Sequence, residues 1–395
     1  MPTLNFEQAR ECVLRQVQGC APSIRETVPL AECAGRVLAE EVTADRDYPP
    51  LTRSVRDGFA VHAGDFPGSA QLVGEVRAGN VYTREVRRGE CVEIMTGAPL
   101  PAGADAVIMI EHTRREGELI FSERAPEPGE FLNPKGSECL AGAAVLSAGQ
   151  RIGFAHVAML ATVGQAEVAV WKRPRVAILA TGDEIVEGGA VLDHQIRNSN
   201  AYSLAVQVRS AGGLPQMLPV ARDEVGATRD LIERGLEADL LLLSGGVSAG
   251  KYDIVEKVLS DLGAEFFFDR VLIQPGQPLV FGKARGKWFF GLPGNPASTM
   301  VTFELFAKAA VQLLTGEKEP GLPLVYARLT EPFRHKPGLT RFLPASLSAD
   351  GSRLTPVRWQ GSSDVAALAR ANAFLVAEHD RESWNGGELM RVLVK

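Results

Sequence analysis

Residues Arg175 to Glu184 have the sequence RVAILATGDE, and this stretch decides the fold class. Arg175 to Ala180 is a short apolar run with the length and composition of a buried strand. The turn Thr181-Gly182-Asp183-Glu184 follows at once and carries two acids. In open α/β sheets the ligand crevice lies at the carboxyl ends of such strands. The stretch therefore predicts a strand of a buried sheet with a binding site at its end.

Two further glycine-rich turns follow apolar runs downstream. One spans Ser244 to Gly250, with Asp253 just beyond it, and the other spans Gly291 to Pro296. Backbone N–H groups at glycine turns and helix N-termini bind anions, and carboxylates bind hard cations such as Mg²⁺. Together the three turns predict a site for a phosphorylated ligand and a metal. The candidate residues are Thr181, Gly182, Asp183, Glu184, Ser244, Gly245, Gly246, Ser248, Gly250, Asp253, Pro293, Gly294 and Asn295.

Each turn also has a purely structural interpretation. An Asp at a strand end can cap the next element, and the other two stretches can be plain strand–helix turns. Gly245, Gly250 and Lys251 have the spacing of a Walker A loop. That loop needs Ser or Thr to hold Mg²⁺ where this chain has Tyr252, so we reject the Walker A interpretation.

Residues 174–318 alternate strand-like and helical stretches. The expected strands are 175–180, 217–221, 239–243 and 288–291, and the expected helices are 199–211, 224–236, 254–262 and 297–315. This alternation is typical of βαβ units. It predicts a central, doubly wound α/β domain with a mostly parallel sheet and helices on both faces.

Composition changes on both sides of this central domain. Residues 4–40 are expected to be helical, because apolar residues recur there near a 3.6-residue spacing. Short apolar runs cut by Gly and Pro predict a β-rich domain at 46–136, inserted into a discontinuous N-terminal domain of residues 1–45 and 137–173. Residues 319–395 contain several short strand-like runs. They predict a small C-terminal β-barrel, with a sandwich as the alternative.

Charge and cysteine content argue against several classes of protein. The net charge of −6 over 395 residues argues against nonspecific nucleic-acid binding, which needs a basic face. The longest apolar runs are strand-sized, and polar residues interrupt the N-terminal segment, so neither a membrane span nor a signal peptide is expected. Five cysteines without a CxxC pair argue against a disulfide framework or a structural zinc site. A reduced, cytoplasmic location is expected.

Several motifs, in the same order, resemble the molybdopterin molybdenumtransferase family, which includes the C-terminal part of gephyrin. The resemblance spans essentially the whole chain. It is carried by Pro50 to Val61 with its S-x-x-D-G-F-A core, by Met95 to Pro99, by Gly103 to Val107 and by the three glycine turns. Taken alone, Asp57-Gly58 in the first of these motifs is mostly a turn signal.

The resemblance implies a four-domain homodimer whose central α/β domain binds the pterin. The implied reaction inserts molybdate into the dithiolene of adenylylated molybdopterin, with Mg²⁺ assisting and AMP leaving, to form molybdenum cofactor. The active cleft would lie between the α/β domain and the β-rich domain of the partner subunit. The resemblance also makes a molybdopterin adenylyltransferase a candidate partner.

Site residues follow from the resemblance motif by motif. Asp57 and Thr96 would come from the β-rich domain, while Glu184 and Asp253 would be acids of the α/β domain that hold Mg²⁺. The remaining candidates are Asp223, Glu138 (where the family often has Asp), Arg341 and Ser362.

Two positions depart from the family pattern. Gln274-Pro275-Gly276-Gln277-Pro278 stands where K-P-G-K-P is common, and glutamine donates hydrogen bonds but cannot neutralise an anion. Arg56 stands where Met is common and adds a cation. The expected effect is either weaker oxyanion binding or compensation by Arg53, Arg56, Arg270 or Arg341.

Three alternatives remain open, and the departures motivate the first two. One is a non-catalytic protein that carries the pterin or its cofactor. Another is a variant that uses tungstate. The third is a nucleotide pyrophosphatase, because the α/β domain resembles one that is found in enzymes cleaving phosphoanhydrides.

Overall fold

The computed structural model describes residues 2–19, 24–245 and 254–395. The chain forms two compact units. The first comprises Met1–Ala39, Gly149–Gly153 and Val168–Lys395, and the second comprises Glu40–Ala148 and Phe154–Glu167. The finer division into four domains remains a prediction.

A seven-stranded sheet forms the centre of the first unit. In spatial order its strands are β1 (Thr3–Leu4), β19 (Glu265–Val271), β21 (Pro278–Ala284), β22 (Lys287–Leu292), β18 (Leu240–Ser244), β14 (Arg175–Ala180) and β17 (Leu214–Met217). All neighbours pair in parallel except at β21, which is antiparallel to both β19 and β22. The predicted mostly parallel sheet is confirmed, with one reversed strand.

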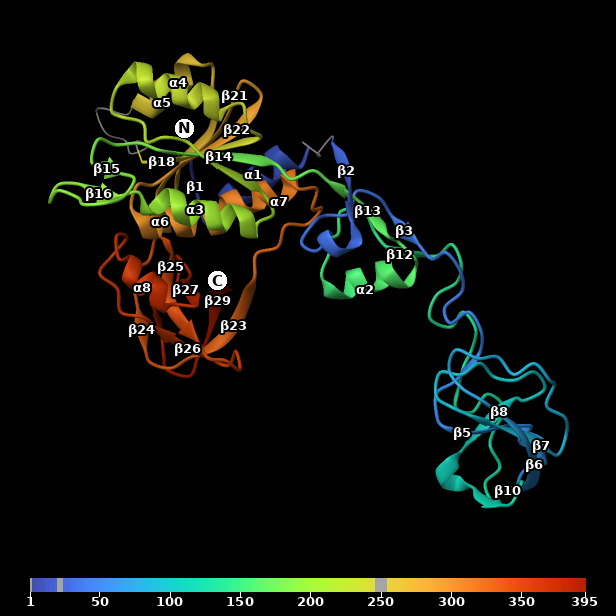
Figure 1. The fold of residues 1–395 in the computed structure, drawn as a ribbon. Helices are drawn as coiled ribbons and strands as arrows, with labels where there is room; N and C mark the ends of the chain where they lie inside the picture. Colours follow the sequence, from blue (N-terminus) through green and yellow to red (C-terminus); the bar gives the residue numbers. More distant parts are fainter. Residues whose placement is uncertain (1, 20–23, 246–253) are drawn as a thin grey trace. The chain divides into compact units, whose positions relative to one another are not determined.

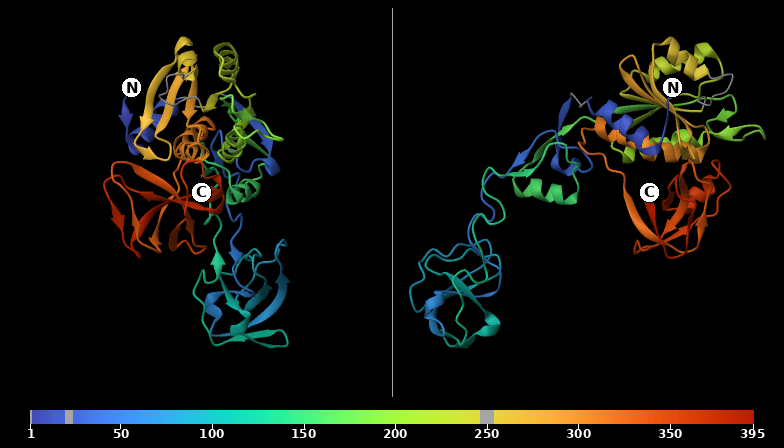
Figure 2. Two further views of the ribbon diagram at one scale, coloured as in Figure 1. Left: turned by 90° about the vertical axis from the view of Figure 1, so that its left-hand side faces the viewer. Right: turned by 180° about the vertical axis from the view of Figure 1, so that it is seen from behind.

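Helices cover both faces of this sheet (Figure 1), and the rear view in Figure 2 shows the same two layers. One face carries α4 (Val225–Gly235) and α5 (Ile254–Asp261). The other carries α1 (Phe6–Gln18), α3 (Ser199–Ser210), α6 (Pro296–Thr302) and α7 (Lys308–Leu314). This arrangement confirms the predicted doubly wound α/β architecture.

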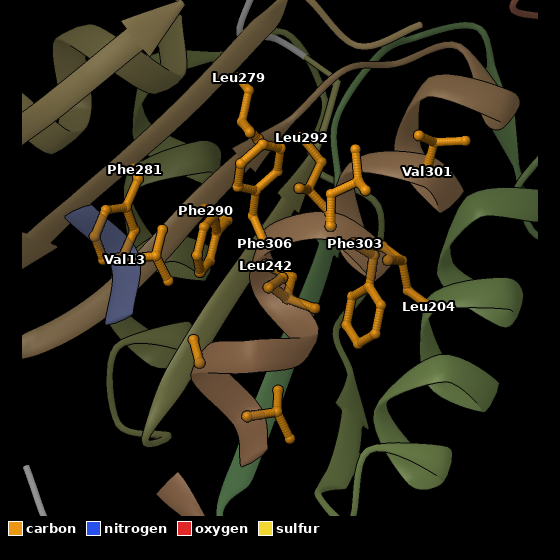
Figure 3. Packing of buried hydrophobic residues seen from close by; sticks show 14 of the residues in the cluster. Val13, Leu204, Leu242, Leu279, Phe281, Phe290, Leu292, Val301, Phe303 and Phe306 are labelled. Carbon is orange, nitrogen blue, oxygen red and sulfur yellow. The ribbon is translucent and has the colours of Figure 1, made fainter. Parts of the chain in front are cut away.

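The core follows the two-residue period of the strands. In β18, Leu240 and Leu242 pack with the α1, α3, α6 and α7 side of the sheet, whereas Leu241 and Leu243 pack with the α4 and α5 side. Such alternation is what a pleated strand imposes on a continuous apolar run. Figure 3 shows the first of these layers, where the rings of Phe281 and Phe290 stack with centroids 4.7 Å apart.

Two local predictions are wrong in position or type. Among the described residues of the range 4–40, α1 is the one long helix. The strand β2 (Arg25–Pro29) follows and pairs with β13 (Glu167–Trp171). Distant strand pairing therefore overrides the local helical pattern. The strand expected at 217–221 lies at Leu214–Met217 instead, because these residues pair with the start of β14.

The helix predicted over 297–315 is interrupted. A π-helical segment, Phe303–Ala307, separates α6 from α7. π-Helical turns inside α-helices leave backbone groups that need other partners. Arg10 of α1 donates from Nη1 to the carbonyl of Leu305, within this segment, at 2.7 Å.

The C-terminal region of the first unit is a closed five-stranded barrel. Its strands are β23 (Leu324–Leu329), β25 (Thr340–Leu347), β26 (Arg353–Pro356), β27 (Ala373–Ala377) and β29 (Leu389–Val394). β27 pairs with both β25 and β29, which closes the barrel. The predicted barrel is confirmed over the sandwich. A short strand, β20 (Ile273–Gln274), pairs with β25 and so joins the barrel to the α/β domain.

The second unit is β-rich, as predicted. Its six-stranded sheet has the order β8 (Ala106–Met109), β5 (Gly58–Val61), β7 (Glu90–Ile94), β6 (Gly68–Val76), β10 (Leu119–Ser122) and β9 (Arg114–Glu116). The short pairs β3 (Val42–Thr43) with β12 (Ala144–Leu146) and β4 (Arg53–Ser54) with β11 (Leu132–Asn133), and helix α2 (Phe154–Thr162), complete it. In the described part of the chain, no helix has the length and apolar character to span a membrane.

Candidate functional site

A cavity of 630 Å³ lies where the turns after β14, β18 and β22 meet. We call it the turn cavity. Parallel neighbours β14, β18 and β22 end at the same sheet edge, so their following turns converge. Predicted residues that line the turn cavity are Thr181, Glu184, Ser244, Gly245, Gln274, Gln277, Pro293, Gly294, Asn295 and Ser362.

Gly245 allows two of these turns to approach closely. Its φ is +94°, a conformation that L side chains rarely adopt, and a Cβ there would lie 2.7 Å from the carbonyl oxygen of Thr181. The backbone N–H of Thr181 in turn donates to the carbonyl of Ser244 at 3.1 Å. Position 245 therefore requires glycine for steric reasons, whether or not a ligand binds.

Asn200 is a residue of the turn cavity that the sequence interpretation missed. It is 9% exposed, and its Nδ2 donates at 2.8 Å both to Ser244 Oγ and to the carbonyl of Gly294. It therefore ties the start of α3 to the turns after β18 and β22. The sequence signal for Asn200 is the run Asn198-Ser199-Asn200 at the start of a predicted helix, a pattern that indicates helix capping. Asn198 does cap α3, accepting from the N–H of Ala201 at 3.2 Å.

The C-terminal barrel supplies one wall of the turn cavity. Asn295 donates from Nδ2 to Ser362 Oγ at 2.8 Å, and the N–H of Ala297 donates to the carbonyl of Ser362 at 2.9 Å. Leu339 and Trp359 of the barrel region also line the cavity. Ser362 is thereby brought to the α/β domain, although it lies far from Asn295 in the sequence.

Several predicted residues do not line the turn cavity. Asp183 accepts from the N–H of Asp223 at 3.2 Å, and Arg222 donates to the carbonyl of Asp183 at 2.8 Å. These contacts favour the structural interpretation of Asp183 as a turn-stabilising residue. Gly182 and Arg341 also lie outside the lining, although Arg341 pairs with Gln274 across β20 and β25. Gly246, Ser248, Gly250 and Asp253 lie outside the described residues.

The described lining of the turn cavity carries little charge. It contains one carboxylate, Glu184, and one guanidinium, Arg197, whose Nε and Nη2 both donate to the carbonyl of Gly189. The other strongly polar side chains there are mostly carboxamides. Residues 2–19, 24–245 and 254–395 contain no group of three His, Cys, Asp or Glu side chains placed to hold a metal. Glu184 alone does not make a Mg²⁺ site, so the described residues fit Mg²⁺ only in part.

The remaining predicted residues gather in the second unit. Asp57 Oδ1 accepts from the backbone N–H of Thr96 at 2.6 Å and from its hydroxyl at 2.8 Å. These two hydrogen bonds hold the pKa of the Asp57 carboxyl below its ordinary value, and the backbone hydrogen bond has the larger effect. Glu138 Oε1 accepts from Asn133 Nδ2 at 2.8 Å. Thr96 and Glu138 line a second cavity of 540 Å³, which Asp57 does not line.

Family models match three successive parts of the chain. Residues 4–164 match the MoeA N-terminal region (domain I and II). Residues 177–313 match a probable molybdopterin binding domain. Residues 326–395 match the MoeA C-terminal region (domain IV).

Two curated relatives carry the name molybdopterin molybdenumtransferase. The one from Staphylococcus aureus (strain Mu50 / ATCC 700699) is 34% identical over 98% of this chain and 94% of its own length. The one from Bacillus subtilis (strain 168) is 35% identical over 93% of this chain and 89% of its own length. Among solved structures, the molybdopterin biosynthesis moeA protein from Pyrococcus horikoshii OT3 aligns over 100% of both chains, with 28% identity and a TM-score of 0.85.

Proposed function

Because this chain belongs to the molybdopterin molybdenumtransferase family and so to molybdenum cofactor biosynthesis, we propose that it inserts molybdate into adenylylated molybdopterin. In this reaction the two dithiolene thiols replace two oxygen ligands of molybdate, which leave with the thiol protons as water. A water molecule hydrolyses the phosphoanhydride bond, and AMP leaves. The observation that carries the proposal is the convergence of the turns after β14, β18 and β22 on one cavity.

The turn cavity suits the phosphate-bearing part of such a substrate. Backbone N–H groups of its glycine turns can bind phosphate oxygens without adding charge. Asn295 and Ser362, already hydrogen-bonded to each other, can orient a substrate between the α/β domain and the barrel. Gln274 and Gln277 also line the cavity and offer amide donors.

Glu184 and Asp253 would hold the Mg²⁺ that the family resemblance implies. When bound, the ion would offset the negative charge of the phosphoanhydride. Glu184 lines the turn cavity, which supports its part in this assignment. Asp253 is assigned from its sequence motif alone.

The family resemblance supports further parts of the proposal. The protein acts as a cytoplasmic homodimer of four-domain subunits, and a molybdopterin adenylyltransferase supplies its substrate. Asp57, Thr96, Glu138 and Asp223 serve the same reaction as catalytic residues. The hydroxyl of Thr96 and the carboxylate of Asp57 form a preorganised pair of acceptors that is suited to orienting a water molecule.

AMP release from adenylylated molybdopterin tests the proposal. The assay contains Mg²⁺ and is run without a metalate, with molybdate and with tungstate. We expect molybdate-dependent AMP release that Glu184→Gln lowers by roughly 100-fold, since it removes a charge used in catalysis. Glu237→Gln, at an exposed site near the opposite end of the sheet, is the matched control and should retain activity.

The same assay separates the alternatives. Tight pterin binding without AMP release identifies a carrier, which the neutral Gln274 and Gln277 and the carbonyl-bound Arg197 favour. Release that depends on tungstate but not molybdate identifies a tungstate-using variant. Hydrolysis of simple dinucleotides without any metalate identifies a pyrophosphatase.

A further inference from the structure

The second cavity is lined by two arginines, and we call it the arginine cavity. It lies wholly within the second compact unit and has a volume of 540 Å³. Its lining residues are Arg46, Tyr48, Pro49, Pro50, Arg53, Ser54, Val55, Thr96, Gly97, Asn133, Glu138 and Thr162. Two of these side chains are cationic and one is anionic, so the lining is positive overall.

Among the residues that the structure describes, Arg53 has no carboxylate partner. Its backbone is fixed on both sides, by pairing with Asn133 of β11 and by a bridge to Pro99. Its guanidinium makes no hydrogen bond or ion pair with any residue that the structure describes, although it is partly buried. The nearby carboxylate of Glu138 is instead hydrogen-bonded by Asn133. A partly buried guanidinium of this kind is well placed to receive an anion.

Arg46 is held over the ring of Tyr48. Its Cζ lies 5.6 Å from the ring centroid. Tyr48 is itself buried, and its hydroxyl lies 2.6 Å from both Asp45 Oδ1 and the carbonyl of Thr162. The ring of Tyr48 restrains this exposed guanidinium through a cation–π contact. The cavity therefore combines one anchored and one unpaired guanidinium.

The turn cavity offers no comparable charge. Its described lining has Arg197 as its cation, and two of the nitrogens of that guanidinium donate to a backbone carbonyl. Four arginines were candidates to compensate for the missing lysines. Arg53 lines the arginine cavity. The other three line neither that cavity nor the turn cavity: Arg56, Arg270 and Arg341.

We propose that the arginine cavity binds a tetrahedral oxyanion carrying two negative charges, through the guanidinium groups of Arg53 and Arg46. Guanidinium groups bind such oxyanions with paired N–H···O hydrogen bonds. The volume of 540 Å³ exceeds that of a single oxyanion, and Pro49, Pro50 and Val55 add apolar surface for an attached organic group. Inorganic phosphate, molybdate and the phosphate of AMP share this chemistry. The site deepens the proposed function and rests on it, because Thr96 and Glu138, which that function uses, also line this cavity.

Isothermal titration calorimetry on the full chain, without pterin and at low ionic strength, tests this site. Inorganic phosphate, molybdate and AMP are titrated separately. We expect Arg53→Gln to raise the Kd of the bound anion at least about tenfold, because it removes a charge-assisted hydrogen-bonding group. Arg53→Lys, which keeps the charge but not the planar fork, should give an intermediate Kd. Arg46→Gln should also weaken binding.

The matched control is Arg87→Gln, which removes the same charge from an exposed site of the same unit outside the cavity. Equal weakening by Arg87→Gln, or an unchanged Kd in both Arg53→Gln and Arg46→Gln, overturns the proposal. So does an absence of binding, or binding that Asn295→Ala abolishes while Arg53→Gln leaves it intact. AMP binding tighter than phosphate identifies a phosphate monoester site, and tighter molybdate binding identifies a metalate site. Because no pterin is present, failure here leaves the AMP-release test of the proposed function untouched.

Discussion

The side-chain amide of Asn200 donates a 2.8 Å hydrogen bond to Ser244 Oγ and a second to the carbonyl of Gly294. One buried carboxamide thus links the start of α3 to two turns of the turn cavity. The arrangement positions these turns before any substrate binds. Preorganisation of this kind lowers the cost of ordering loops on binding.

Replacing Asn200 tests this positioning role. Asn200→Ala leaves Ser244 Oγ and the Gly294 carbonyl without their donor, which should lower the free energy of unfolding by roughly 1–3 kcal/mol. Urea unfolding of the full chain measures the change. Gln216→Ala, an exposed amide on edge strand β17, serves as the control and should stay within about 0.5 kcal/mol of the parent protein. Equal unfolding midpoints for both variants would contradict the role of Asn200.

Gly245 should not tolerate a side chain. In Gly245→Ala, the new Cβ would lie 2.7 Å from the Thr181 carbonyl oxygen at a φ of +94°. We expect a loss of at least about 1 kcal/mol from the backbone strain alone, plus displacement of the turn. Gly188→Ala is the matched control, because no atom lies within 4 Å of its Cβ position and its φ is not positive. Thermal unfolding that fails to distinguish the two variants would refute the steric argument.

The pKa of Asp57 should depend on the hydroxyl of Thr96. Thr96→Val removes one of the two donors to Asp57 Oδ1, so the lowered pKa of this carboxyl should rise toward its ordinary value. Thr96→Ser keeps the hydroxyl and should keep the lowered pKa. Carboxyl carbon chemical shifts followed by NMR during a pH titration measure both.

The lowered pKa of Asp57 determines how the free energy of unfolding changes with pH. At pH values above the ordinary pKa of an aspartate, the two hydrogen bonds to Asp57 stabilise the folded state. This contribution disappears as the pH falls through the lowered folded value. A Thr96→Val protein that titrates Asp57 at the same pH as the parent would show that the backbone N–H alone sets the pKa.

Two cysteines of the second unit should differ in reactivity. Cys91 is fully buried, and burial raises the pKa of its thiol to about 12. Only about one thiol in ten thousand is then a thiolate at pH 8. Cys139 is partly exposed. Iodoacetamide at pH 8 should alkylate Cys139 at least about 100-fold faster than Cys91, as measured by peptide mass spectrometry. Comparable rates in the folded protein would contradict this; after denaturation both should react.

Local patterns predicted the strands and helices around the turn cavity. Apolar runs bounded by glycine turns placed β14, β18 and β22, and the alternation with helical stretches predicted the doubly wound α/β domain. These features depend on residues close in sequence, whose periodicity reports burial directly. Parallel neighbours end at one edge, so the same patterns also predicted that Thr181, Ser244 and Asn295 would meet.

Long-range pairing decided the rest. The strand at Arg25–Pro29 and the closure of the barrel each depend on a distant partner strand. No local period encodes the identity of that partner, because strand formation depends strongly on tertiary context.

The same limit applies to side chains. Asn200 and Gly294 lie 94 residues apart in the sequence, so their hydrogen bond exists only in the folded chain. Likewise, the sequence alone determined that Arg53 is a cation beside an Asp-Gly turn, but only the tertiary structure decided that its guanidinium lines a cavity without a carboxylate partner among the described residues. Charge belongs to a residue type, whereas the pairing of a charge depends on which distant groups the fold brings within hydrogen-bonding distance.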